Sequence, residues 1–420
     1  MIASEKKIFE FFKSHSKFFS QLISKYFPLN ENLLEQYQDK LYWNCLSKNE
    51  AIIWTPEILD KFSERWNWNS IVEYAKIPWS EKLLEKFSDK LNWEYLSWSE
   101  ELPWTPELIE KFKDKWFWEH LSWNESIPWT IELLEDYASK WNWRELSKNK
   151  KIPWSKELIS KYEDMWDWNS LSSNEGLPWS AGFIKKFENK LYWSNLSKNE
   201  GLYWTIELIR NYQDKLYWYD LSENKELPWS IDLVDEFVDK WDWSDLSSNQ
   251  GLPLLAELIA RYEKKWDWDR LSANQRVPWS LELLEKYEKK WDWTELSKNE
   301  KLLWSLELLE KYEDKWNWAE LSKNRSVQLT EELVEKYESK WNWFNLSWYP
   351  ALPWSQKFLE KYKDKFEWSD LSWNEGLPWT LELIDKFRSK WDWSLLSCNE
   401  VVWEKAFKEY INIELLKEIF

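Results

Sequence analysis

Apolar and polar positions along this chain follow a pattern that repeats every 25 residues, without insertion or deletion, from Asn30 to about Glu404. In the copy that begins at Thr105, the apolar positions are Leu108, Ile109, Phe112 and Trp116. These residues fall on one side of a helix, and Glu, Lys and Asp occupy the other side. The pattern therefore predicts a first helix of about eleven residues in every repeat.

The residue that opens each repeat is typical of a helix N-cap. It is Ser, Thr or Asn in fourteen of fifteen copies, and the exception is Leu255. Such side chains accept hydrogen bonds from the free N–H groups of a first helical turn. Pro56 and Pro106 follow directly, at the position where a missing N–H costs nothing.

A second, shorter helix is predicted after a turn. Trp118 lies off the apolar stripe, yet its position is Trp in all fifteen copies, so the chain must turn between Trp116 and Trp118. The intervening residue is Asp or Asn in ten copies, which suits a new N-cap. With Leu121 on its inner side, the second helix is expected to end near Asn124, because Asn tolerates the left-handed conformation of a C-cap.

A unit this small cannot bury its own apolar face, so the repeats must stack on one another. We expect an all-α, right-handed solenoid of about fifteen two-helix repeats, forming one elongated domain. Residues 1–29 are predicted to form an N-terminal helical cap, 30–404 the repeats and 405–420 a C-terminal capping helix. The Ser and Asn that recur after Leu121 are expected to satisfy turn backbone groups, and a polar binding track is the alternative.

A second fold has to be weighed. The sequence LSSNQGL from Leu246 to Leu252 resembles a stretch of leucine-rich repeats, whose period is also close to 25. That resemblance implies an α/β horseshoe with one strand in each repeat. The two residues before Leu246 are polar, however, as they are in most copies, and polar residues are poor strand formers.

Tryptophan is the most unusual component, with 42 residues in a chain of 420. Most of them occupy three positions of the repeat. Four lie instead where most other copies have Lys, Ser or Glu, as two pairs in adjacent repeats: Trp98 with Trp123, and Trp348 with Trp373. Exposed tryptophans in pairs are typical of interaction surfaces, so these four and the neighbouring Tyr349 are the predicted partner-binding residues. The alternative is that they only pack on their neighbours.

The net charge of −18 combines 57 basic with 75 acidic residues. Such a mixed surface argues against nucleic-acid binding, which needs a basic stripe.

No apolar stretch reaches the roughly 20 residues of a membrane span, and no signal peptide is evident, so a membrane partner is not expected. Cys45 and Cys398 lie fourteen repeats apart and could not meet in an extended array. Reduced thiols and a cytoplasmic location follow, and the tandem copies and residue usage suggest a bacterial or viral source.

Candidate chemistry is sparse. The only histidines are His15 and His120, and no phosphate loop, metal motif or nucleophile elbow is present. We therefore expect neither enzyme activity nor a cofactor or metal. The predicted function is a non-enzymatic scaffold that binds a macromolecule, above all a protein, through a concave face and the Trp pairs. The alternatives are an aromatic groove for a sugar or nucleotide, and self-assembly.

Overall fold

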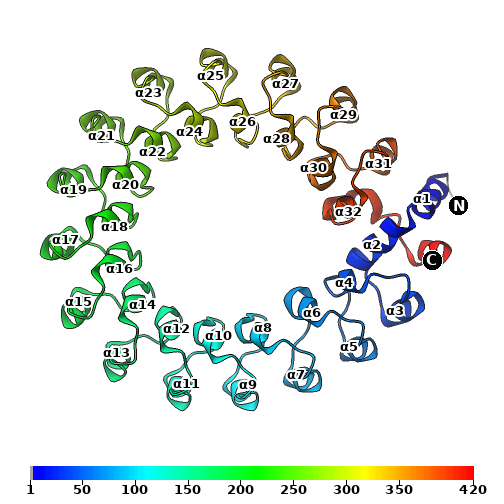
Figure 1. Ribbon diagram of the computed structural model, residues 1–420, viewed down its shortest axis with the longest axis horizontal. Coiled ribbons are helices and arrows are strands. Elements are labelled where there is room, and N and C mark those ends of the chain that lie inside the picture. The colour runs from blue at the N-terminus through cyan, green and yellow to red at the C-terminus, as the bar shows by residue number, and fades with distance from the viewer. Residues whose placement is uncertain (1–2) are drawn as a thin grey trace. The chain divides into compact units, whose positions relative to one another are not determined.

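The computed structural model describes residues 3–420, with side chains from Lys7 onward, and this part of the chain is helical throughout without a strand. The all-α solenoid of two-helix repeats is confirmed, and the α/β horseshoe is not supported. The chain divides into two compact units: residues 1–92 with 304–420 form unit 1, and residues 93–303 form unit 2. Within unit 2 the repeats follow an arc with the second helices on its concave side (Figure 1).

Every repeat has a short first helix of six or seven residues. The fifteen first helices are α3 (Glu31–Tyr37), α5 (Pro56–Lys61), α7 (Glu81–Lys86), α9 (Pro106–Lys111), α11 (Ile131–Asp136), α13 (Lys156–Lys161), α15 (Ala181–Phe187), α17 (Ile206–Tyr212), α19 (Ile231–Glu236), α21 (Ala256–Arg261), α23 (Leu281–Lys286), α25 (Leu306–Lys311), α27 (Glu331–Lys336), α29 (Gln356–Tyr362) and α31 (Leu381–Lys386).

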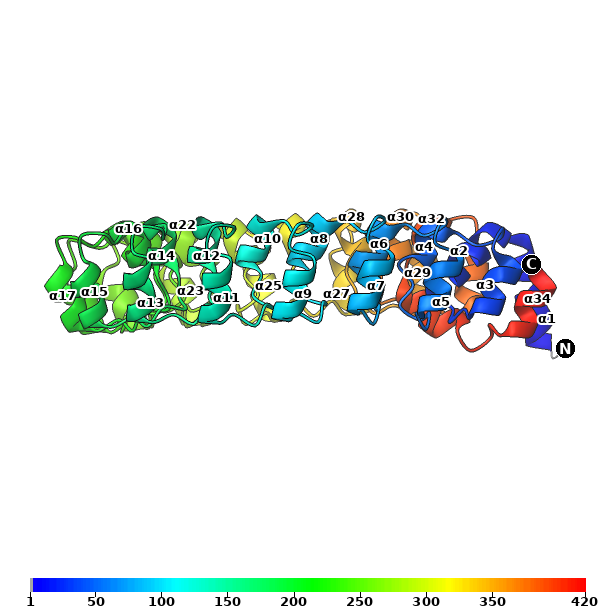
Figure 2. The same cartoon turned by 90° about the horizontal axis from the view of Figure 1, so that it is seen from below.

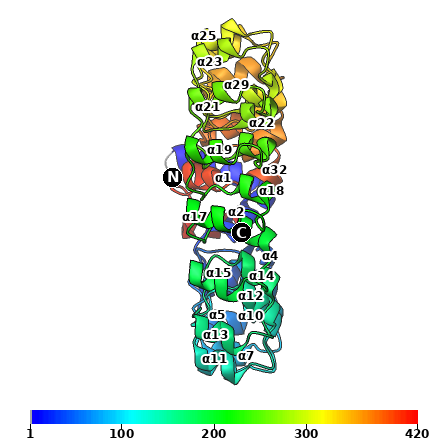
Figure 3. The ribbon, with the colours of Figure 1, turned by 90° about the vertical axis from the view of Figure 1, so that its left-hand side faces the viewer.

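Every second helix begins at the invariant tryptophan. The fifteen are α4 (Trp43–Leu46), α6 (Trp68–Tyr74), α8 (Trp93–Trp98), α10 (Trp118–Trp123), α12 (Trp143–Lys148), α14 (Trp168–Ser173), α16 (Trp193–Lys198), α18 (Trp218–Glu223), α20 (Trp243–Ser248), α22 (Trp268–Ala273), α24 (Trp293–Lys298), α26 (Trp318–Leu321), α28 (Trp343–Ser347), α30 (Trp368–Trp373) and α32 (Trp393–Leu396). Seen from the side, α10, α12 and α14 lie toward one edge of unit 2, and α9, α11 and α13 toward the other (Figures 2 and 3).

The predicted N-caps are confirmed, but the first helix is shorter than predicted. The hydroxyl of Thr105 accepts a hydrogen bond from Leu108 N at 3.1 Å, and Leu255 alone among the fifteen first helices makes no such cap. Helix α9 ends at Lys111, because Phe112 leaves helical geometry (φ −112°, ψ 23°). Hydrogen-bonded turns then connect Phe112 to Trp116. These turns keep both aromatic rings on the apolar stripe from which a longer helix was predicted.

Buried Ser and Asn side chains join most repeats to their neighbours. The amide of Asn124 donates to the carbonyls of Ser97 and Ser99, at 3.1 and 3.2 Å, and its oxygen accepts from Ser126 N at 2.9 Å. The Ser97 hydroxyl accepts from Phe117 N at 2.9 Å. The expectation of structural Ser and Asn is thus confirmed, and their burial excludes a polar binding track at these positions.

The predicted left-handed C-cap at this asparagine is wrong. Asn124 has extended backbone (φ −66°, ψ 111°), and no residue of the described chain, glycine included, has positive φ. The side chain is selected for reaching two carbonyls of the preceding repeat, which leaves its backbone with no need for the left-handed region.

Aromatic residues fill the space between successive repeats. The ring of Trp118 lies 4.9 Å from that of Tyr137 and 4.8 Å from that of Trp141, both in the next repeat, and Trp129 lies 5.0 Å from Trp141. The invariant tryptophan thus packs against the following repeat, while its indole N–H donates to Lys113 O within its own repeat at 3.0 Å. Large aromatic areas buried in this way supply much of the stabilisation of a stack of small units.

Lysines of one repeat also pair with the repeat before it. Lys140 lies 5.1 Å from the centre of the Trp118 ring and 3.6 Å from Asp114. The same arrangement recurs for Lys265, over Trp243 and beside Asp239. These pairs are exposed, so each contributes only a few tenths of a kcal/mol to about 1 kcal/mol.

The two ends of the chain pack on each other within unit 1. The terminal elements are α1 (Ala3–Ser14), α2 (Ser16–Tyr26), α33 (Glu400–Val402), the π-helix η1 (Trp403–Phe407) and α34 (Ile413–Ile419). Phe18 contacts Trp393 of the last repeat, with ring centres 5.2 Å apart, and Phe19 contacts Phe420 at 5.2 Å. Figure 1 shows α2 between α32 and α4.

Helix α2 continues the Ser and Asn network as an additional, degenerate repeat. Ser24 Oγ accepts from Tyr42 N at 2.9 Å, and Asn49 donates to Ser24 O at 3.0 Å, as between ordinary repeats. On its other side, the Tyr26 hydroxyl donates to Cys398 O at 2.7 Å. The N-terminal segment therefore contacts the last repeat as well as the first.

The argument that the two cysteines cannot approach each other is wrong. Both are free and half-buried, and they lie near enough for the charge of Cys398 to raise the pKa of Cys45, although burial has the larger effect. The argument failed because it assumed an extended array, whereas α2 brings the last repeat and the first together.

Candidate functional site

The four tryptophans at the unusual position are the most exposed tryptophans of the described chain. Their exposed fractions are 38% for Trp98, 43% for Trp123, 51% for Trp348 and 38% for Trp373. Every other tryptophan is buried or half-buried. The structure thus confirms that this position lies at the surface, at the C-terminal ends of the second helices.

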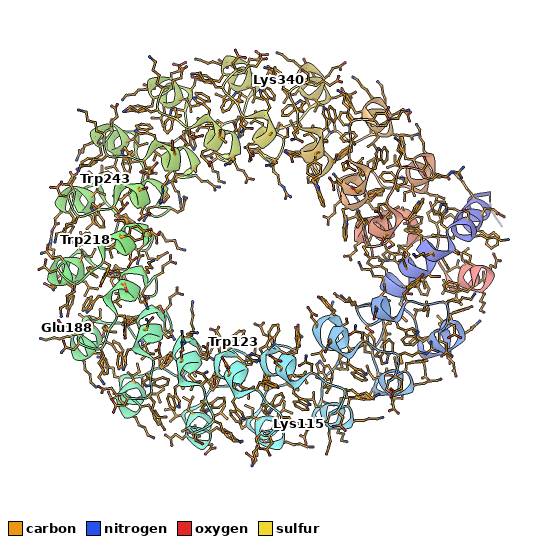
Figure 4. All side chains as sticks on the ribbon, in the orientation of Figure 1. Lys115, Trp123, Glu188, Trp218, Trp243 and Lys340 are labelled. Atoms are coloured by element: carbon orange, nitrogen blue, oxygen red, sulfur yellow. The ribbon has the colours of Figure 1, made fainter. Side chains whose placement is uncertain are left out.

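Trp98 and Trp123 form a pair on neighbouring second helices of unit 2. Helices α8 and α10 pack side by side, which places the indoles 6.5 Å apart between ring centres and 23° from parallel. Tyr95 packs beside Trp98, with ring centres 4.4 Å apart. Figure 4 shows Trp123 on the concave side of the arc, away from the first helices. The pair is a continuous aromatic surface open to solvent.

Trp348 and Trp373 occupy the same positions on α28 and α30 in unit 1, but their surroundings differ. Phe344 stands exposed one turn before Trp348, where α8 and α10 carry glutamates. Tyr349, predicted to belong to this patch, is 4% exposed and lies in the interior. It replaces the network asparagine, and its hydroxyl donates to Val327 O at 2.9 Å. The second pair therefore has a more apolar neighbour than the first, and Tyr349 is part of the buried interior beneath it.

Asp370 lies beside the second pair. Burial raises the pKa of the Asp370 carboxyl, the charge of Glu367 adds to this effect, and a hydrogen bond from Trp348 opposes it. The exposed indole of Trp348 thus has the Asp370 carboxyl group as its hydrogen-bond acceptor.

A pocket of about 780 Å³ lies where α2 meets the first and last repeats, and sequence reasoning missed it. Its walls include Tyr26 stacked on Trp403, with ring centres 5.8 Å apart and planes at 16°. Trp373 also lines the pocket, which links the second Trp pair to it. The sequence does hold one sign that the N-terminal segment is irregular. Asn30, the first N-cap, comes six positions after Ser24, whereas in ordinary repeats the N-cap comes eight positions after the corresponding serine.

Charges of both signs surround this pocket. Lys25 donates to Cys398 O at 3.1 Å, and Lys48 lies 4.4 Å from the centre of the Tyr74 ring, so neither lysine is engaged with a carboxylate there. Glu375 and Glu400 are on other walls. Burial raises the pKa of the Tyr26 hydroxyl, and the nearby Cys398, Glu400 and Cys45 raise it further. The pocket can therefore present both cationic and anionic groups to a ligand.

The two histidines lie in different settings. The ring of His15 packs at a tilt against that of Trp393, with ring centres 4.3 Å apart, and contributes to the packing of the chain ends. His120 Nδ1 lies 3.3 Å from Glu94 O on the surface of unit 2. Within residues 3–420, no group of three or more His, Cys, Asp or Glu side chains is arranged to hold a metal ion. In the same range, no helix has the length and apolar character that a bilayer span requires.

Comparison with known proteins gave no match. No protein-family model, no curated protein and no solved structure matches this chain.

Proposed function

We propose that this protein is a non-enzymatic scaffold that binds a protein partner through the exposed Trp pairs at the ends of its second helices. The observation that carries the proposal is the exposure of Trp98, Trp123, Trp348 and Trp373, against the burial or half-burial of every other tryptophan. Tryptophan is strongly enriched among the residues that dominate binding energy at protein interfaces.

The repeat itself gives no reason to place tryptophan at these four positions. Elsewhere the same position carries Lys148, Lys298 or Lys323, each of which pairs with a glutamate three residues earlier on its own helix. Replacing such a lysine by Trp exposes apolar area and removes an ion pair, both of which work against solubility. A surface that exposes such apolar side chains in adjacent repeats is suited to burial by a partner. The cytoplasmic location and the bacterial or viral source stay predictions.

The direct test is affinity capture from the native source with two variants. One carries Trp98→Ala, Trp123→Ala, Trp348→Ala and Trp373→Ala. The control carries Tyr192→Ala and Tyr217→Ala, which remove exposed aromatic rings elsewhere. A stoichiometric protein captured by the wild type and the control, and lost from the Trp variant, is the expected result. A partner retained by the Trp variant would refute the proposal.

A second candidate function is the binding of a small ligand, such as a sugar or nucleotide, in the pocket beside α2. Its volume of about 780 Å³ lies within the range of ordinary ligand sites, and aromatic faces suit both ligand classes. Thermal unfolding with a ligand library tests this function. A true ligand raises the midpoint of the wild type but not that of Lys25→Met or Trp373→Ala, whereas Trp348→Ala, outside the pocket, keeps the shift. No shift across nucleotides and sugars would reject it.

Self-assembly through end-to-end stacking is less well supported. Helix α2 and the C-terminal helices cover the last repeat and the first, the surfaces that such a stack would use. We expect light scattering to give one molecular mass over a wide concentration range, and growth of that mass with concentration would restore the self-assembly hypothesis.

A further inference from the structure

The two Trp pairs differ in the residue four positions before each tryptophan, and this difference points to the chemistry of a partner. On α8 and α10, Glu94 and Glu119 stand four residues before Trp98 and Trp123, so each carboxylate lies on the same helix face as an indole. Both glutamates are exposed, and neither forms an ion pair in the described chain. On α28 and α30 the corresponding residues are uncharged.

The acidic character extends beyond these two residues. The chain has neither Lys nor Arg in residues 91–110 or 116–139, although each stretch carries five acidic residues. The intervening lysines belong to the side of the first helices: Lys113 pairs with Glu110 at 2.7 Å, and Lys115 lies 5.4 Å from the centre of the Trp93 ring. Figure 4 shows Lys115 and Trp123 on opposite sides of the ribbon.

The surface position that carries tryptophan in α8 and α10 carries lysine in α12. In α12 the surface lysine, Lys148, neutralises Glu145 at 2.7 Å. In α8 and α10 the corresponding position is tryptophan, so no lysine stands beside Glu94 and Glu119 on their own helices. Unscreened negative charge beside an aromatic face is the environment that a desolvated cation prefers.

We infer that the Trp98 and Trp123 surface binds an arginine-rich segment of a partner protein. Guanidinium groups stack on the two indoles, and Glu94 and Glu119 accept hydrogen bonds from their edges. Arginine is favoured over lysine because its planar group can stack on an indole and bind a carboxylate at the same time. This inference rests on the proposed function and adds the class of partner. Nucleic acid does not fit, because its phosphates would face the glutamates.

The test uses fluorescence anisotropy with the full-length protein and three labelled peptides of equal length. One alternates Arg with Ser, the second replaces Arg by the neutral isostere citrulline, and the third replaces it by Glu. We expect the Arg peptide to bind at least about tenfold more tightly than the other two, and this binding to weaken as salt is raised.

Three variants locate the site. Trp98→Ala with Trp123→Ala should weaken binding of the Arg peptide by at least about tenfold, because cation–π contacts at two rings are lost. Glu94→Gln with Glu119→Gln should weaken it by a similar factor and reduce its salt dependence. Trp348→Ala with Trp373→Ala is the matched control and should change the affinity less than about twofold, since Phe344 and Ser369 stand there in place of Glu94 and Glu119. Circular dichroism verifies that each variant is folded.

The inference is overturned if the Arg peptide does not bind, if citrulline binds equally well, or if the Trp98 and Trp123 substitutions leave the affinity unchanged. Capture of the native partner separates this failure from a failure of the proposed function. A captured protein that depends on the Trp pairs but lacks a basic segment would leave the scaffold function standing and reject the arginine-rich partner. Capture that ignores the Trp pairs would reject both.

Discussion

At the scale of single residues, one repeat position decides whether a side chain serves the stack or the surface. Many tryptophans at three positions donate indole hydrogen bonds to backbone carbonyls, as for Trp118 to Lys113 O and Trp129 to Asn124 O, whereas the buried indole N–H of Trp141 makes no such bond. Asn124 and Ser97 close the network between repeats from inside. The fourth tryptophan position has no place in this network, which is why its occupant is free to vary.

Removal of a network asparagine should cost much more than removal of a surface one. Asn124→Ala leaves two buried carbonyls and the N–H of Ser126 with fewer partners, so we expect the free energy of unfolding to fall by about 2–4 kcal/mol. Asn44→Ala, at an exposed position, should change it by less than about 0.5 kcal/mol. Urea denaturation measures both, and equal effects would contradict the structural role of the buried asparagine.

The raised pKa of Asp370 predicts a stability effect that depends on pH. Because the pKa is higher in the folded protein, ionisation of this carboxyl opposes folding at neutral pH, and the cost disappears as pH falls below the ordinary Asp value. Asp370→Asn should therefore raise the thermal midpoint at pH 7 and lose this advantage near pH 3.5. A lower midpoint at pH 7 would show that the carboxylate is stabilising, and an advantage that is independent of pH would show that ionisation is not the cause of the gain.

At the scale of helices, a repeat of two very short elements is stable only because each element is capped and each contacts its neighbours. The predicted N-caps and the start of every second helix follow from local side-chain chemistry, so the sequence was sufficient for them. The length of the first helix was predicted too long, because hydrogen-bonded turns keep Phe112 and Trp116 on one side without continuing the helix. Periodicity alone cannot distinguish these two conformations.

The first helix that lacks a cap offers a stabilising substitution. Leu255 has the extended backbone of an N-cap (φ −81°, ψ 150°) but no acceptor, and its side chain is 51% exposed. Leu255→Ser should raise the free energy of unfolding by about 1 kcal/mol. Leu306→Ser is the control, since it removes an equally exposed leucine from a helix already capped by Ser305. A gain in both variants, or in neither, would show that capping is not the cause.

At the scale of the whole chain, the period predicts the stacking of repeats but not the contact between the N-terminal and C-terminal segments. The terminal segments were expected to cap an elongated array, but they contact each other through residues such as Tyr26 and Cys398, which lie 372 positions apart in the sequence. The pocket beside α2 was missed for the same reason. The four exposed tryptophans were identified from the sequence because they depart from a pattern that is otherwise regular.

The contact between the chain ends can be tested by zero-length cross-linking. Lys7 Nζ lies 3.9 Å from Asp385 Oδ2, so a carbodiimide should join α1 to α31 within one molecule. Lys61 and Glu35, in adjacent repeats and 2.7 Å apart, provide the positive control. A mixture of isotopically labelled and unlabelled protein distinguishes links within a molecule from links between molecules. A Lys7 to Asp385 link found only between molecules would contradict the packing of the ends.

The functional proposals all depend on the division of the 42 tryptophans into structural and surface residues. Photochemical oxidation followed by peptide mass spectrometry measures the exposure of each tryptophan separately. Trp98, Trp123, Trp348 and Trp373 should react fastest, because they are the tryptophans with the largest exposed fractions. Slow reaction of these four, or equal reaction of the invariant position represented by Trp118, would contradict the assignment of a surface role to them.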